Sequence, residues 1–225
     1  MPDDVVVGKD VWKVYGHGET QVEALRGVDV RIRRGEMLAI VGPSGSGKTT
    51  FLNCFSGLDD ITRGEIRIDG VSPSSMDDRG RSDYRARRVG FVFQSYNLLP
   101  VLTAIENVEM PLLIAGADGR DARQRSDGVL SDLGLRDRLD RLPAELSGGQ
   151  QQRVSLARAL VAKPAIVWAD EPTGNLDEAT SHQVVDLLRT LNRTYQQTLV
   201  VVTHDPQVAS ACDRTLHMQD GRFVS

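Results

Sequence analysis

The chain has few of the features that mark secreted, membrane-spanning or nucleic-acid-binding proteins. Only Cys54 and Cys212 are cysteines, too few for a disulfide framework or a zinc site. No apolar run approaches the roughly 18 residues that a membrane-spanning helix needs. The N-terminal sequence MPDDVVVGKDVW is acidic and lacks the basic, then apolar, layout of a signal peptide. The net charge of −4 argues against a general nucleic-acid binder. We therefore expect a cytoplasmic globular protein without a nucleic-acid partner, in which Cys54 is a small buried hydrophobe.

The most informative stretch is Gly42–Thr49, whose sequence GPSGSGKT fits the phosphate-loop pattern G-x-x-x-x-G-K-[ST]. The apolar run Met37–Val41 precedes it and predicts the buried parallel strand from which such a loop leaves. Glycines let backbone N–H groups turn toward an anion, and the start of the next helix adds the positive end of its dipole. In this pattern Lys48 contacts the β- and γ-phosphates and the Thr49 hydroxyl binds Mg²⁺. The stretch therefore predicts a nucleoside triphosphate site.

Polar residues follow four predicted strands at the point where each strand ends. The strands are 37–41, 89–93, 165–169 and 198–202, followed by the phosphate loop, Gln94, Asp170–Glu171 and Thr203–Asp205. Strands that alternate with helices predict an α/β fold with a parallel sheet and a ligand at the strand C-termini. A helical stretch at 95–162 interrupts the alternation, and we expect it to be an inserted subdomain.

The acidic pair Asp170–Glu171 follows the apolar run Ala165–Ala169, where an aspartate can hold Mg²⁺. Because neighbours in a strand point to opposite sides, one carboxylate would face the metal and the other the γ-phosphate and its attacking water. Glu171 is therefore the candidate general base. Gln94 or His204 alone would be weak evidence for a site. They become candidates because each follows the end of a strand in the same predicted sheet.

Ser147-Gly148-Gly149 precedes a helix-forming run at 154–162 and predicts a second anion-binding helix start. The first anion-binding helix start follows the phosphate loop, and the second lies in the predicted inserted helical subdomain. A single nucleotide does not need both of them from the same chain. Two chains arranged head to tail, each completing the other's site, would use both. The pair of helix starts therefore favours a homodimer.

Together these residues resemble the ATP-binding cassette (ABC) ATPases over essentially the whole chain. Gly42–Thr49 is similar to the Walker A loop, and Leu146–Gln150 (LSGGQ) matches the family signature in full. The other matches are Gln94 of the Q-loop, Ala165–Asp170 of Walker B, the catalytic glutamate Glu171, Gly174–Asp177 of the D-loop, the switch histidine His204, and Tyr15, where the family places a ring that stacks on adenine.

The resemblance implies a P-loop NTPase fold with a RecA-like core, an N-terminal antiparallel β subdomain and an inserted α-helical subdomain. In a single ABC ATPase domain over 1–225, the core and β subdomain would occupy about 1–94 and 163–225, and the helical subdomain about 95–162. ATP and Mg²⁺ are the implied ligands. Lys48, Gln94, Glu171 and His204 would be catalytic, and Thr49, Gln94 and Asp170 would hold the metal. The implied nucleotide-binding residues are Tyr15, Gly42, Ser44, Gly45, Ser46, Gly47, Lys48, Thr49, Thr50, Ser147, Gly148, Gly149, Gln150 and Asp177.

Three segments, Phe91–Pro100, Glu106–Val108 and Ala169–Asp177, look like the lipoprotein-releasing and macrolide-exporter ATPases, with the cell-division ATPase a close cousin. ATPases of that subgroup work with a four-helix membrane protein that has a large extracytoplasmic domain. Because the sequence ends at Ser225, we expect this permease to be a separate chain, with the ATPase peripheral on the inner face of the cell membrane. Trp168, where an aliphatic residue is commoner, departs from the family pattern, and Asn175 is a variant typical of the subgroup.

Three functions remain open from the sequence. The first is an ATPase motor that dimerises around two MgATP and drives export, lipoprotein release or mechanical transmission. The second is a regulatory ATPase of the cell-division type, which signals through its membrane partner to a cell-wall hydrolase and transports nothing. The third is a cassette protein of translation or DNA maintenance, which the single cassette and the acidic balance disfavour.

Overall fold

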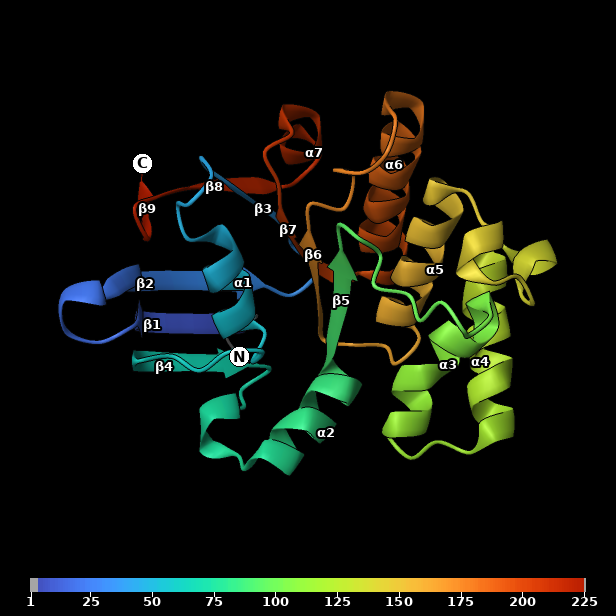
Figure 1. The fold of residues 1–225 in the computed structure, drawn as a ribbon, viewed down its shortest axis with the longest axis horizontal. Coiled ribbons are helices and arrows are strands. Elements are labelled where there is room, and N and C mark those ends of the chain that lie inside the picture. The colour runs from blue at the N-terminus through green and yellow to red at the C-terminus, as the bar shows by residue number, and fades with distance from the viewer. Residues whose placement is uncertain (1–3, 225) are drawn as a thin grey trace. The chain divides into compact units, whose positions relative to one another are not determined.

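The computed structural model describes residues 4–224, which form two compact units (Figure 1). One unit contains the chain up to Arg81 together with the segment from Arg189 onward, and the other contains Ser82–Leu188. Helices α2 (Asp78–Arg88) and α6 (Glu178–Tyr195) run across the two divisions of the chain. Over the described residues, no helix combines the length and the hydropathy that crossing a membrane requires.

The first unit contains a three-stranded antiparallel sheet. Strand β1 (Asp4–Tyr15) lies between β2 (Val22–Arg33) and β4 (Arg63–Ile68). Val6, Ile32 and Ile68 are fully buried on this sheet, as expected where one face packs on a core. The predicted N-terminal antiparallel β structure is confirmed, and β1 and β2 are each 12 residues long.

The same unit carries the parallel strands that hold the phosphate loop. Strand β3 (Met37–Val41) pairs in parallel with β7 (Thr198–Val202) and with β8 (Arg214–Gln219), and β9 (Arg222–Val224) turns back antiparallel to β8. Every residue of β7 is buried, which explains its unbroken apolar sequence. Helix α7 (Pro206–Ser210) joins β7 to β8. The predicted parallel strands are confirmed, and β8 and β9 form a closing hairpin.

Helix α1 (Lys48–Phe55) contacts β1, β2 and β7 and so connects the two groups of strands (Figure 1). Its Phe51 and Phe55 rings stack with centroids 4.1 Å apart, and Phe223 of β9 meets Phe51 edge-on at 5.3 Å. Such aromatic pairs add to the energy of burial. Cys54 is buried in the same layer, as predicted.

In the second unit, β5 (Val89–Phe93) pairs in parallel with β6 (Ile166–Asp170). Helices α3 (Ala104–Ile114), α4 (Gly119–Asp132) and α5 (Gly148–Leu160) contact one another, and α5 also contacts β5. Helix α6 buries Val184, Leu188 and Leu191, which lie on one face at helical spacing, and α2 buries no residue. Short 3-10 turns occur at Gly18–Thr20, Pro73–Ser75, Arg136–Arg138 and Pro143–Glu145.

Asn107 fixes the turn that leads into α3. Its side-chain amide donates to the carbonyl oxygens of Leu99, Leu102 and Thr103 at 3.0–3.1 Å, and its oxygen accepts from the Leu99 N–H. Asn107 is 1% exposed, so Asn107→Ala leaves several polar groups buried without partners. We expect it to lower the free energy of unfolding by about 2–4 kcal/mol in urea titrations. Leu113→Ala, at a 43% exposed position of α3, should change it by less than about 0.5 kcal/mol.

Burial raises the pKa of the Cys54 thiol to about 12. The reactive thiolate is therefore scarce in the folded protein at pH 8, although an unperturbed cysteine would be partly ionised there. We expect Cys54 to resist iodoacetamide at pH 8 and to be alkylated once the chain is unfolded in urea, as read by peptide mass spectrometry. Rapid alkylation of Cys54 in the native protein would contradict the burial of this side chain.

Candidate active site

The phosphate loop leaves β3 at Gly42 and enters α1 at Lys48, and three glycines give it its shape. Gly42, Gly45 and Gly47 have φ values of 158°, 79° and 105°. A Cβ atom on Gly42 would lie 2.1 Å from the Met218 carbonyl oxygen, and one on Gly47 would lie 2.6 Å from that of Ala24. Only glycine fits at these two positions, which accounts for the spacing that the sequence shows.

Hydrogen bonds hold the loop against the β8–β9 turn. The Gly221 N–H donates to the Ser46 carbonyl oxygen at 2.9 Å, and the Lys48 ammonium donates to the carbonyl oxygens of Gly42 and Pro43 at 2.8 Å each. The Lys48 ammonium therefore lies over the loop, at the N-terminus of α1, where the helix dipole favours negative charge.

Two further features of the loop suit the binding of a phosphate group. The Ser46 hydroxyl is buried and has no hydrogen-bond partner within residues 4–224, so an incoming acceptor would satisfy it. A Cβ atom on Gly45 would meet nothing within 4 Å, so the loop is open on that side. A buried donor beside an open, glycine-lined loop suits an anion.

Two other predicted site residues belong to this unit. Tyr15 ends β1 with its side chain 40% exposed. Burial and a hydrogen bond to Asp59 raise the pKa of its phenol to about 12, against a smaller opposing effect of Thr50. His204 follows β7 and is exposed. Its neighbours are Thr203, which is buried, and Asp205, which is the N-cap of α7.

The acidic pair lies in the second unit, and one detail of the prediction is wrong. Strand β6 ends at Asp170, whereas Glu171 lies beyond it with a left-handed φ of 45°. The alternation of side chains along a strand therefore does not apply to the pair, and a backbone turn sets the direction of Glu171. Phe93 pairs with Asp170 across the sheet, so Gln94 and Glu171 follow adjacent strand ends.

Asn175 connects the D-loop to Gln94. Its amide donates to the Gln94 carbonyl oxygen at 2.9 Å, and its side-chain oxygen lies 3.4 Å from the Gln94 amide nitrogen. A Cβ atom on Gly174 would lie 2.8 Å from that nitrogen, so the glycine lets the D-loop approach the Gln94 side chain closely. From the sequence, Asn175 was expected only as a D-loop residue and a variant typical of the subgroup. Its contact with Gln94 spans 81 residues and has no signal in the local sequence.

The signature segment forms the start of α5. Ser147 is the N-cap and makes a capping box with Gln150: the Ser147 hydroxyl accepts from the Gln150 N–H, and the Gln150 side chain accepts from the Ser147 N–H. A Cβ atom on Gly149 would lie 2.5 Å from the Thr180 side chain, and one on Gly148 would lie 3.0 Å from the Tyr96 hydroxyl. The two glycines therefore allow the Q-loop and α6 to pack against this helix start.

Asp177 of the D-loop and Gln152 of α5 both make structural hydrogen bonds. The Asp177 carboxylate accepts from the Thr180 N–H and hydroxyl at 2.9 and 2.8 Å, and these bonds lower its pKa. Gln152 of α5 is fully buried and donates to the Pro172 carbonyl oxygen at 2.6 Å. Gln152 was missed because its position in a glutamine-rich helix start gives no sign of a long-range contact.

The donor set for a metal is spread along the chain. Thr49 belongs to the first unit, and Gln94 and Asp170 belong to the second. Within the part of the chain that the structure describes, no group of three or more His, Cys, Asp or Glu side chains forms a metal cage. The hydroxyl, the amide oxygen and the carboxylate of these residues are each hard oxygen donors, the type that Mg²⁺ binds together with phosphate oxygens.

Comparisons with known proteins identify the family of the chain. The sequence profile of the family described as "ABC transporter" matches residues 25–174. The chain is 47% identical to "Uncharacterized ABC transporter ATP-binding protein YbbA" of Escherichia coli K12 over 99% of this chain and 98% of that protein. It is 46% identical to "Lipoprotein-releasing system ATP-binding protein LolD" of Legionella pneumophila strain Paris over 100% and 99% of the two chains.

Solved structures give the same result for the fold. The cassette MJ0796, solved as a dimer in "a post-hydrolysis state … bound to ADP and Pi", superposes with a TM-score of 0.88 at 42% identity, over 98% of this chain and 97% of that one. The match confirms the predicted ABC ATPase fold. The chain belongs to the ABC transporter family and is an ATP-binding subunit of the kind that hydrolyses ATP.

Proposed function

We propose that this chain is the motor subunit of a lipoprotein-releasing type of ABC transporter and dimerises around two MgATP. The geometry of the phosphate loop is the observation that carries the proposal. Gly42 and Gly47 allow main-chain contacts that no other residue permits, and Ser46 offers a buried donor that has no partner among the described residues. Together with Lys48, Thr49 and Thr50 at the start of α1, the loop would hold the triphosphate of ATP.

In this proposal, residues at two strand ends prepare the attack of water on the γ-phosphate. Glu171 would accept the proton of the attacking water as the general base, and His204 would assist beside the γ-phosphate. Thr49, Gln94 and Asp170 would hold Mg²⁺, which neutralises charge on the phosphate oxygens when it is bound. Asn175 would position Gln94 through the hydrogen bond to its carbonyl oxygen.

Dimerisation would supply the second helix start. Ser147, Gly148, Gly149 and Gln150 begin α5 with N–H groups and the positive end of the helix dipole, which suit a phosphate presented by a second copy of this chain. The dimer of MJ0796, with ADP and Pi, is a precedent at 42% identity. Asp177, already at the start of α6, would lie at the same interface.

A groove in the second unit is our candidate contact with the separate membrane subunit. Apolar side chains of β5 and α3 line it, including Phe91, Phe93, Pro111 and Ile114. The charged side chains of Arg85 and Arg158 also line it. Ile114 is 61% exposed, unusual for an isoleucine in a packed helix. We propose that a short amphipathic cytoplasmic segment of the permease fills this groove, which would hold the ATPase on the inner face of the membrane.

The choice of lipoprotein release among transport functions follows the relatives. Proteins named as lipoprotein-releasing ATP-binding subunits are 46–48% identical to this chain over nearly its whole length. Stimulation of ATP hydrolysis by lipoprotein in the reconstituted complex would support release. Recruitment of a cell-wall hydrolase without such stimulation would support the regulatory alternative instead.

Replacing Glu171 by Gln tests the chemical assignment. The amide cannot accept the proton of water, so we expect steady-state ATP hydrolysis to fall by at least about 100-fold. Binding of MgATP, measured by calorimetry, should be retained. Glu178→Gln, at an exposed carboxylate of α6, is the matched control and should hydrolyse ATP at the normal rate. A normal rate in Glu171→Gln would show that another group is the base.

Replacing Ile114 by Asp tests the groove. When the partner fills the groove, a carboxylate at position 114 would be buried without a partner of opposite charge, which is costly. We therefore expect Ile114→Asp to abolish copurification of the membrane subunit in detergent. The ATPase rate of the isolated chain should not change. Val224→Asp, at a 44% exposed position on β9, is the control and should copurify normally. Retention of a four-helix partner by Ile114→Asp would remove the groove as its docking site, and copurification of a many-span permease would remove the subgroup assignment.

A further inference from the structure

A charged pair beneath Tyr15 has no role in the function proposed so far. The Tyr15 hydroxyl donates to one Asp59 carboxylate oxygen at 2.7 Å, and the Lys13 ammonium donates to the other at 2.7 Å. The Lys13 ammonium also lies 4.7 Å from the centre of the Tyr15 ring. The three side chains form a closed group in which each one contacts the other two.

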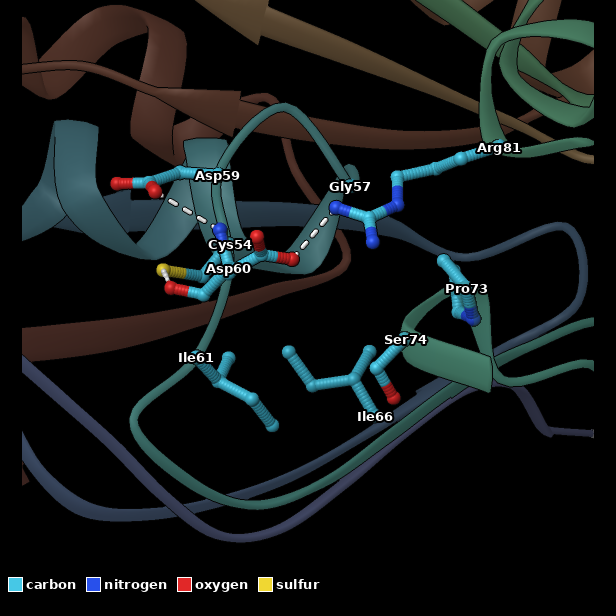
Figure 2. Close-up of a pocket in the computed structure, with 9 residues that line it drawn as sticks. All are labelled: Cys54, Gly57, Asp59, Asp60, Ile61, Ile66, Pro73, Ser74 and Arg81. Atoms are coloured by element: carbon cyan, nitrogen blue, oxygen red, sulfur yellow. Dashed lines mark hydrogen bonds and ion pairs between the residues drawn. The ribbon is translucent and has the colours of Figure 1, made fainter. Parts of the chain in front are cut away.

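The loop that carries Asp59 is fixed to α1. The N–H groups of Leu58 and Asp59 both donate to the carbonyl oxygen of Asn53, at 2.9 and 3.0 Å. The Asp59 carboxylate also accepts from the Asp60 N–H at 2.8 Å, as Figure 2 shows. Since α1 begins at the phosphate loop and ends beside this loop, one short helix connects the phosphate site to the Tyr15 ring.

Asp60, the next residue of the loop, makes contacts of its own. In Figure 2 the Asp60 side chain points toward Arg81, with which it forms an ion pair, while the Asp59 carboxylate points elsewhere. The Lys13 ammonium reaches the Asp60 main chain as well, donating to its carbonyl oxygen at 2.6 Å. Lys13 is 9% exposed, so these bonds are shielded from competing water.

The electrostatics favour this arrangement at neutral pH. Burial raises the pKa of Asp59, but the hydrogen bonds from Lys13 and Tyr15 outweigh it, and the pKa lies below its usual value. Asp59 is therefore ionised, and the Tyr15 phenol, with its pKa of about 12, keeps the proton it donates. Hydrogen bonds between a neutral donor and a charged acceptor are among the stronger ones.

We propose that Asp59 and Lys13 are positioning residues for adenine, which fix the Tyr15 ring at a set place relative to the phosphate loop. The inference rests on the proposed function, in which Tyr15 stacks on the base of ATP. The Lys13 ammonium lies over the ring, and Tyr15 is still 40% exposed, so part of the ring can meet a flat, uncharged base. A ring that is already held in place loses less freedom when the nucleotide binds.

The test compares a ligand that has a base with one that has none. Calorimetric titrations with the Mg²⁺ complexes of a non-hydrolysable ATP analogue and of tripolyphosphate separate contacts to the base from contacts to the phosphates. We expect Asp59→Ala to weaken the ATP analogue about tenfold, the effect of one hydrogen bond to a charged group, and to leave tripolyphosphate unchanged. Asp60→Ala removes the neighbouring carboxylate and is the matched control, with both affinities at the wild-type value.

Tyr15→Phe completes the experiment. It keeps the ring but loses the hydroxyl, so we expect the same loss as in Asp59→Ala and no further loss in the double variant. Asp59→Asn retains an acceptor for the hydroxyl and should recover part of the affinity. Lys13→Met should weaken the ATP analogue without affecting tripolyphosphate. Thermal melting of each variant checks that it is folded.

The outcomes separate this inference from the function on which it rests. Wild-type affinity for the ATP analogue in both Asp59→Ala and Lys13→Met, or an equal loss for tripolyphosphate, would overturn the positioning role. An equal loss in Asp60→Ala would overturn it too, because the loop as a whole would then be responsible. If Tyr15→Ala bound the ATP analogue like wild type, the contact of Tyr15 with adenine would itself be wrong.

Discussion

The close approach of main chain to main chain at Gly42 and Gly47 is the constraint on which the candidate site depends. Carbonyl oxygens of Met218 and Ala24 occupy the space where any side chain would begin. This packing, with positive φ values at Gly42 and Gly47, sets the course of the loop between β3 and α1. The position of Lys48 above the loop, and of the Tyr15 ring at the far end of the helix, both follow from it.

Most of the fold could be predicted because its signals are local. The four apolar runs became β3, β5, β6 and β7 within one residue of their expected ends, since a strand buried on both faces must be apolar throughout. The closing hairpin was likewise predictable from Asp220-Gly221. The lengths of β1 and β2 were not, because several irregularities in their pairing interrupt the alternation that would reveal a long strand.

The site was predictable in its residues but less so in its geometry. Gly42–Thr49 and Leu146–Gln150 carry patterns that only a few structures use, and each starts a helix as expected. The direction of Glu171 was not accessible, because the left-handed backbone of this residue after β6 has no signal in the apolar run that precedes it. Three hydrogen bonds join segments that are far apart in the sequence, so no local pattern predicts them. They link Asn175 with Gln94, Gln152 with Pro172, and Asp59 with Tyr15.

The central claim is that two copies of this chain complete each other's site. Mixing two inactive variants, Lys48→Ala and Ser147→Arg, tests it most directly through the rate of ATP hydrolysis. In a mixed dimer one site would carry both defects, while the other would pair an intact phosphate loop with an intact signature helix. We predict that activity returns on mixing and is absent from each variant alone. If the mixture stays as inactive as its components although mixed dimers form, each site is built from a single chain and the account is wrong.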